Sequence, residues 1–311
     1  YGFVTKISNS QTLTNMALSR QTVKSIAMPM AMVVGALLCR QLEALEQLSG
    51  NMLTPSLIAS MLFLTFCRVD VRTMRLSLIH LWMLLFQFVG SVVAYYVVTM
   101  LMGEIVGQGA MICVLAPIAM AAVVIGGMLG ANITTMATYS LICNLATALV
   151  APMILHTFGT GSCTFVQIIS RVAPTLIAPF VAGQLCRLLW HRGAEWFAAH
   201  SSLSFYLWLI SLILVIGRTT CFILDTPADA FVEVELALVA LVICLVQFSV
   251  GRVLGRAAGD IVAGGQSLGQ KNTVLAVWMA LNFLDPVASV APTAYIVWQN
   301  FVNSYQIYRK K

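Results

Sequence analysis

Apolar residues recur along the chain in runs of about 20, separated by short polar stretches. A run of this length, wound as a helix, crosses the roughly 30 Å hydrocarbon core of a bilayer. The pattern predicts ten membrane-spanning helices, at 22–39, 51–67, 75–101, 108–127, 133–155, 164–190, 201–222, 233–255, 262–284 and 286–308. An even number of spans places both ends of the chain on the same side of the membrane.

The composition agrees with this pattern. Of the 311 residues, 60% are hydrophobic and 9% are charged, against about a quarter charged in ordinary soluble proteins. We therefore expect residues 1–311 to form a single all-α membrane domain surrounded by lipid. The net charge of +6 does not indicate a nucleic-acid partner, because the basic residues are sorted between the two sides of the membrane.

The predicted spans divide the charged residues unequally. The side of the chain ends holds Lys6, Arg20, Lys24, Arg68, Arg72, Arg75, Arg187, Arg192, Arg252, Arg256, Arg309, Lys310 and Lys311. The opposite side holds Arg40 and Arg218 among Glu43, Glu46, Glu104, Asp225, Asp229, Glu233, Glu235 and Asp285. Basic residues concentrate on the cytoplasmic side of membrane proteins. Both termini are therefore expected in the cytoplasm, with the chain in a bacterial inner membrane.

Two basic residues fall inside predicted spans. Arg171 lies about seven residues into its span, close enough to the interface for its guanidinium to reach water. Lys271 lies near the middle of the ninth span, within GGQSLGQKNTVLAVWMALNF (264–283). A buried ammonium at that depth costs at least about 3 kcal/mol. Lys271 is therefore expected to face a protein-lined cavity.

Two short segments in the first half of the chain resemble segments in the second half, and we call these pairs internal echoes. GALLCR (35–40) resembles GQLCR (183–187), and LFQFVG (85–90) resembles LVQFSVG (245–251). Chance likeness between apolar helices is the alternative explanation. A repeat of five spans must enter the membrane from the opposite face in its second copy. The echoes thus predict two inverted five-helix repeats, an architecture of many secondary transporters.

In such a repeat the fourth and ninth spans correspond, and both are interrupted. Pro117 breaks the fourth, and glycines with polar neighbours break the ninth around 264–272. Unwound backbone at membrane depth is tolerated only where protein buries it or where it lines a cavity. We therefore predict that both spans are broken near the middle of the membrane and that Lys271 lies where a binding site is expected.

The last two spans carry a resemblance to a known family. Gly269, Asn272, Leu275 and Ala276 form a Gly-x-x-Asn-x-x-Leu-Ala pattern, followed by an Asn-Phe-x-Asp-Pro turn at 282–286. Together with APFVAGQLCRL (178–188) and Gln87, they resemble the bile acid:sodium symporter family. The specific part of this likeness lies in about the last 45 residues.

The resemblance implies a panel subdomain (22–67 and 164–222) and a core subdomain (75–155 and 233–308), in which the fourth and ninth helices cross at their unwound centres. It also implies an organic anion bound between the subdomains and two sodium ions at the crossing. The family's usual glutamate and glutamine of the ninth helix fall on Ser267 and Lys271. Its Ser-Asn pair of the fourth helix falls on 122–123, or on 126–132 with a gap. The carboxylate is absent under either alignment, so sodium coupling is not expected.

We interpret the Lys271 ammonium as a replacement for the bound cation, donating to carbonyls of Ala116, Pro117 or their neighbours and to Gln87. Three roles stay open: a purely architectural tie, a proton-coupling lysine, or a fixed attractor for an anion. The predicted substrate or crossing site comprises Lys271, Asn272, Gln270, Ser267, Gln266, Gln87, Pro117 and Ala116.

The predicted function is a secondary transporter of a small organic anion, working by alternating access without sodium. The alternatives are a proton-coupled or exchange transporter of another organic solute and a passive channel. P-loop, HExxH and GxSxG motifs are absent, so we predict no enzyme activity. The eight cysteines show no CxxC spacing, and no metal or cofactor is expected. The expected oligomeric state is a monomer or a weak homodimer.

Overall fold

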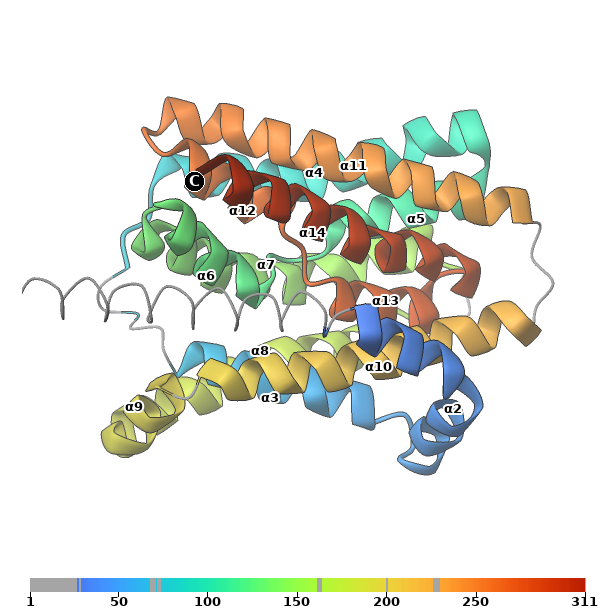
Figure 1. Ribbon diagram of the computed structural model, residues 1–311, viewed down its shortest axis with the longest axis horizontal. Helices are drawn as coiled ribbons and strands as arrows, with labels where there is room; N and C mark the ends of the chain where they lie inside the picture. Colours follow the sequence, from blue (N-terminus) through green and yellow to red (C-terminus); the bar gives the residue numbers. More distant parts are fainter. Residues whose placement is uncertain are drawn as a thin grey trace, which may run out of the picture.

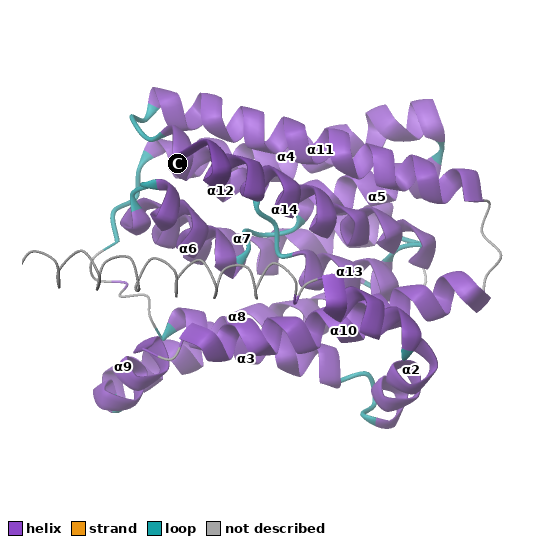
Figure 2. Cartoon of the chain, in the orientation of Figure 1, coloured by secondary structure: helices purple, strands orange, loops and turns teal. Residues whose placement is uncertain are grey.

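The computed structural model describes residues 27, 29–67, 71, 74–160, 164–199, 201–225 and 230–310, and every regular element within these ranges is a helix (Figure 2). Residues 29–37 are helical. The helices that follow are α2 (Cys39–Leu48), α3 (Leu53–Phe66), α4 (Leu78–Met102), α5 (Glu104–Leu115), α6 (Met120–Leu129), α7 (Ile133–Phe158), α8 (Phe165–Leu189), α9 (His191–Ala199), α10 (Ser201–Asp225), α11 (Ala230–Ala257), α12 (Ile261–Gly269), α13 (Thr273–Phe283), η2 (Pro286–Ser289) and α14 (Val290–Lys310).

An all-α membrane protein is confirmed by these helices. Five of those described (α4, α7, α8, α10 and α11) are long and apolar enough to cross a bilayer, and α2 with α3 adds a sixth if that pair, bent by 84°, counts as one span. Helices lie at the other expected positions too, but ten membrane crossings and an inverted repeat stay predictions. Several residues named above lie outside the described ranges: Lys6, Arg20, Lys24, Arg68, Arg72, Asp229, Lys311, and residues 22–26 and 28 of the first expected span. The same holds for one of the eight cysteines, Cys163.

Side-chain caps explain where several helices begin. Asn132 accepts a hydrogen bond from the backbone N–H of Thr135 at the start of α7, and Asp260 accepts from Ala263 at the start of α12. Asp285 caps η2, with Pro286 in the first position. Each cap satisfies an N–H group that the helix itself leaves unpaired.

Two short helices, α2 and α9, lie where the apolar runs predict only connecting loops. Both are too short and too polar to register as spans, since α2 has 10 residues and α9 has 9. One side of α2 nevertheless packs against α10. A search for runs of about 20 apolar residues misses amphipathic helices of this kind.

The helices form two groups that lie side by side in Figure 1. The helices α2, α3, α8, α9 and α10 lie in the lower part of the view, and α4 to α7 with α11 to α14 lie above them. Between the groups, α7 packs on α8 and α10 on α13. The largest buried cluster includes residues of both groups, among them Ile58, Phe66, Leu115 and Val274.

A charged network ties α2 to α3 and α10. Glu46 is fully buried, and its carboxylate accepts hydrogen bonds from the backbone N–H and the hydroxyl of Thr54. Arg218 on α10 lies 3.8 Å from Glu46 and 3.3 Å from Glu43. Arg40 pairs with Asp225 at the end of α10. The two arginines assigned to the acidic side of the membrane thus both have carboxylate partners.

Glu46→Gln is expected to lower the free energy of unfolding by about 1–3 kcal/mol. The substitution replaces one buried acceptor oxygen by an NH2 group, which cannot accept a hydrogen bond from Thr54 and carries no negative charge to pair with Arg218. Thermal unfolding of the purified protein in detergent measures the effect. Glu43→Gln serves as the matched control, and its effect is expected to be smaller because that side chain is 28% exposed. Equal losses in the two variants would contradict the assignment of Glu46 as the centre of the network.

Candidate functional site: a crossing of two interrupted helices

The helical segments at 104–129 and 261–283 are both interrupted, and the interruptions meet. The first break separates α5 from α6, and the second separates α12 from α13. The N–H of Ala119 donates to the carbonyl of Gln270, and the N–H of Asn272 donates to the carbonyl of Pro117, each at 2.8 Å. These two bonds form an antiparallel bridge between Ile118 and Lys271. The two interrupted segments therefore meet at their breaks.

Each half-helix at the crossing is short. The helix α5 has 12 residues and α13 has 11, which corresponds to roughly 16–18 Å of helix. The C-termini of α5 and α12 and the N-terminus of α13 are buried inside the protein. The last carbonyls of a helix have no partner within the helix, and its C-terminus carries a partial negative charge. Both features favour a cation beside it.

Lys271 supplies that cation. Its side chain is 1% exposed, and its Nζ donates to the carbonyl oxygen of Val114 at 2.9 Å. Its backbone N–H donates to Oε1 of Gln299 on α14, also at 2.9 Å. Among the described residues no carboxylate forms an ion pair with it. The positive charge is thus held by backbone dipoles.

Three side chains, two from helices and one from the break between α12 and α13, satisfy the end of α5. Gln247 on α11 donates to the carbonyl of Cys113 at 3.1 Å, Lys271 to that of Val114, and Gln87 on α4 to that of Leu115 at 2.8 Å. The carbonyl before these, on Ile112, accepts from the N–H of Ala116. The last four carbonyls of α5 are all occupied, which removes the penalty for burying a helix end.

Gln87 is itself fixed by the helix behind it. Its Oε1 accepts from the Tyr139 hydroxyl and from the Cys143 thiol, each at 3.0 Å, both on α7. On the opposite side of the crossing, the Tyr295 hydroxyl donates to the last carbonyl of α12, on Gly269, at 2.9 Å. The crossing is therefore held by buried polar contacts from α4, α7, α11 and α14.

A polar side of α14 faces α12. Gln299, Asn303 and Gln306 follow the helical spacing of three to four residues, and Gln266 donates to the last two at 3.2 and 3.1 Å. Several buried polar atoms here have no partner in the described structure: Oε1 of Gln266, Oγ of Ser267, Oε1 of Gln270, Nδ2 of Asn303 and Nε2 of Gln306. Such atoms are commonly satisfied by buried water.

The structure gathers the predicted site residues at or beside the crossing, with some contacts as expected and others different. Lys271 donates to the carbonyl of Val114, a neighbour of Ala116 and Pro117, as expected. The Oε1 atom of Gln87 accepts from α7 and not from the lysine. The carbonyl of Pro117, an expected acceptor for the lysine, accepts from the backbone N–H of Asn272. Asn272 also caps the start of α13 through its side chain. Ala116 is the residue directly after the end of α5. Gln266, Ser267 and Gln270 lie on the buried end of α12 next to the bridge.

Four residues that hold the crossing were not among the predicted site residues: Gln247, Tyr295, Gln299 and Asn303. The sequence holds a signal for some of them. Gln247 occupies the place of Gln87 in the internal echo, and Gln299, Asn303 and Gln306 form a polar stripe in an otherwise apolar span. Tyr295 donates to a backbone carbonyl, and a backbone partner cannot be identified from the residue types in a sequence.

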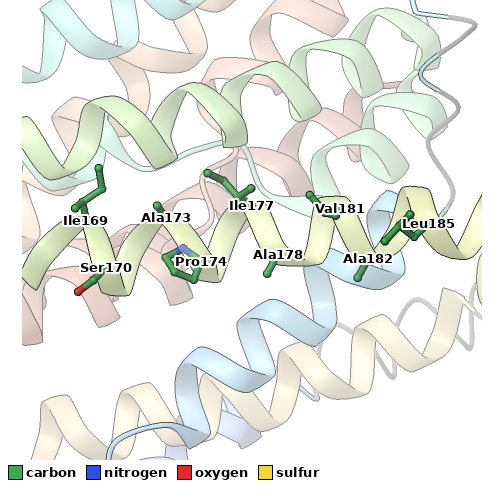
Figure 3. Close-up of a pocket in the computed structure, with 9 residues that line it drawn as sticks. All are labelled: Ile169, Ser170, Ala173, Pro174, Ile177, Ala178, Val181, Ala182 and Leu185. Atoms are coloured by element: carbon green, nitrogen blue, oxygen red, sulfur yellow. The ribbon is translucent and has the colours of Figure 1, made fainter. Parts of the chain in front are cut away.

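The predicted site residues line neither of two grooves on the described surface. One, of about 570 Å³, runs along α8 and is lined by Ile169, Ser170, Ala173, Pro174, Ile177, Ala178, Val181, Ala182 and Leu185 (Figure 3). Its single polar side chain, Ser170, offers no charge to an anion. The other lies between α11 and α14. The crossing itself is closed in this conformation, because Lys271 and its neighbours are buried.

Within the described ranges, no three His, Cys, Asp or Glu side chains gather in a way that could hold a metal ion. Of the described cysteines, Cys39, Cys67, Cys113, Cys143, Cys221 and Cys244 are buried, and Cys186 is partly exposed. Their positions agree with packing roles.

Comparisons with known proteins identify no relative: no family model matches this chain, and no curated protein does.

Proposed function

We propose that the protein is a secondary transporter that moves a small organic anion by alternating access, with Lys271 as a built-in cation at the crossing. The observation that carries the proposal is the contact between the buried Lys271 ammonium and the carbonyl of Val114 at the end of α5. In the proposal, the chain forms two inverted five-helix repeats in a bacterial inner membrane, with both termini cytoplasmic.

The bridge supports the inverted repeat. Two equivalent hydrogen bonds exchanged between 117–119 and 270–272 give the crossing a local two-fold symmetry. Transporters built from inverted repeats place broken helices at the midplane, where half-helix ends bind charged groups.

The bond network supports a fixed cation in preference to a mobile alkali ion. An alkali ion needs several oxygen ligands, and here the carbonyl oxygens of Cys113, Val114 and Leu115 each accept from a side-chain nitrogen. Ser267 adds a hydroxyl and no carboxylate. In the proposal the core helices (α4 to α7 and α11 to α14) move against the panel helices (α2, α3, α8 and α10), while the lysine keeps the crossing intact.

Proteoliposome counterflow tests this function. Vesicles loaded with an unlabelled organic acid are expected to accumulate its labelled form against a gradient, and the rate is expected to stay the same when potassium or choline replaces sodium. A screen of organic acids by thermal shift selects the substrate. Counterflow is absent from a passive channel, and a rate that follows a proton gradient would favour the proton-coupled alternative.

The same assay tests the reason for sodium independence. Lys271→Gln alone is expected to create no sodium dependence, because Ser267 supplies no carboxylate. Lys271→Gln combined with Ser267→Glu places both of the resembled family's usual residues at the crossing and is expected to show thermal stabilisation that saturates with sodium. Saturable stabilisation of the unmodified protein by sodium would overturn the fixed-cation proposal.

A further inference from the structure

A groove of about 510 Å³ lies between α11 and α14, away from the crossing residues that the proposed function uses. Its apolar part is formed by Leu241, Leu245, Phe248, Trp298, Phe301 and Val302. Leu245 and Phe301 are 49% and 65% exposed. The two helices are held together here by a hydrogen bond from Nε1 of Trp298 to the carbonyl of Ala237 at 3.0 Å. In a membrane protein such a surface is covered by lipid chains or by another helix.

One end of the groove is polar and positively charged. Ser249, Arg252, Tyr305 and Gln306 line that end, and the guanidinium of Arg309 lies 5.8 Å from the centre of the Tyr305 ring. No carboxylate lines the groove. Arg252 forms no ion pair in the part of the chain that is described. The amide Nε2 of Gln306 is a buried donor without a partner.

The position of Arg252 is set by the packing beneath it. A Cβ atom at Gly265 of α12 would lie 2.8 Å from Cγ of Arg252, so the arginine stem rests on a glycine where any other residue would displace it. The stem is thus in place while the guanidinium stays exposed.

The length of the groove matches one leaflet. From Leu241 to Arg252 the helix rises about 16 Å, and half of a typical hydrocarbon core is about 15 Å. The charged end lies near the C-termini of both α11 and α14, on the side where the sequence concentrates basic residues. An acyl chain therefore fits along the apolar part while an anionic headgroup reaches the two arginines.

From these observations we propose that the groove between α11 and α14 binds an anionic phospholipid, with its phosphate at Arg252 and Arg309 and one acyl chain along Leu245 and Leu241. Because Arg252 rests on Gly265 of α12, that side chain links the bound lipid to the helix that ends at the crossing. This binding requires neither substrate nor transport.

Lipid titration of the purified protein in neutral detergent tests the proposal. Dioleoyl-phosphatidylglycerol is added in one arm and dioleoyl-phosphatidylcholine, with identical chains, in another. Bound lipid is counted by native mass spectrometry, and the melting temperature is recorded in parallel. Glycerol phosphate in a third arm provides the headgroup without chains.

The anionic lipid is expected to bind in preference to the zwitterionic one and to raise the melting temperature by roughly 2–4 °C. Arg252→Gln is expected to weaken binding about fivefold, and it keeps the Cβ and Cγ atoms that pack on Gly265. Leu245→Trp, which fills the apolar part, is expected to weaken binding as well. Arg256→Gln removes the same charge one turn away, outside the groove lining, and is expected to bind like the unmodified protein.

Each other result overturns the proposal in a distinct way. Equal binding of the two lipids would leave only a non-selective lipid surface. Equal weakening by Arg252→Gln and Arg256→Gln would reduce the effect to net charge. A matching response to glycerol phosphate would indicate a site for soluble anions, and a dimer in the mass spectrum that anionic lipid does not displace would indicate a second copy as the occupant.

Discussion

Lys271→Met is expected to reduce counterflow by about 100-fold while changing the melting temperature by no more than about 3 °C. The loss of activity corresponds to removal of one charged hydrogen bond of roughly 3 kcal/mol. Without the ammonium, the end of α5 has neither a fixed cation nor an alkali ion beside it while the core moves. The measurements are counterflow in proteoliposomes and thermal unfolding in detergent.

The small change in stability follows from two opposing terms. Removing the ammonium leaves the carbonyl of Val114 buried without a partner, which costs about 1–3 kcal/mol. It also removes the penalty for burying a charge that no carboxylate pairs, which is at least about 3 kcal/mol on insertion scales. The two terms nearly cancel, so stability and transport separate in this variant. In the proposal, Lys271 therefore contributes to transport and adds little to stability.

Two outcomes would contradict this prediction. Full counterflow by Lys271→Met would make the ammonium dispensable for transport. A fall of about 10 °C or more in the melting temperature, together with lost counterflow, would make Lys271 an architectural tie alone. Arg256→Gln is the matched control, because it removes one positive charge from an exposed position on α11 and is expected to leave both measurements unchanged.

The position of the candidate site could be predicted because the residues that break the helices are visible in the sequence. Pro117 lacks an N–H group and clashes with the preceding turn, and polar residues around Lys271 interrupt an apolar span. Both features are local, so neither depends on knowing which helices meet. The bridge between Ile118 and Lys271 forms where these two signals place it.

The partners within the site could not be predicted in the same way. The carbonyl that accepts from Lys271 belongs to Val114, whose side chain carries no polar group, and any carbonyl at the end of α5 would satisfy the same rule. Which one accepts depends on the register between α5 and 270–272, which tertiary packing fixes. For the same reason Gln87 was assigned to the correct region and to the wrong partner.

The short helices were missed for a different reason. The hydrophobic runs that identify spans depend on length, so α2 and α9, with 10 and 9 residues, give no comparable signal. The buried Glu46 adds to the difficulty, because a carboxylate in a predicted loop suggests solvent exposure. Its partners come from α3 and α10, which the local sequence does not reveal.

The glycines of α11 and α12 lead to the second large effect. A Cβ atom at Gly264 would lie 2.2 Å from the carbonyl oxygen of Gly251 and 2.7 Å from Cα of Gly255. These neighbours are backbone atoms of α11, so no side-chain rotation relieves the clash, and the two helices have to move apart. Since α12 ends at the crossing, that movement also displaces 270–272.

Gly264→Ala is accordingly expected to lower the free energy of unfolding by about 3 kcal/mol, at the upper end of overpacking effects, and Gly264→Val is expected to prevent recovery of monodisperse protein. Thermal unfolding and size-exclusion chromatography in detergent measure the two effects. Gly90→Ala is the matched control: it lies in the middle of α4, where a Cβ atom would meet its nearest neighbours at 3.7–3.8 Å, so it should be neutral or stabilising by up to about 1 kcal/mol. If Gly264→Ala were as stable as Gly90→Ala, α11 and α12 would not be in backbone contact, and the position of Lys271 would have to be set by α14 and α5 alone.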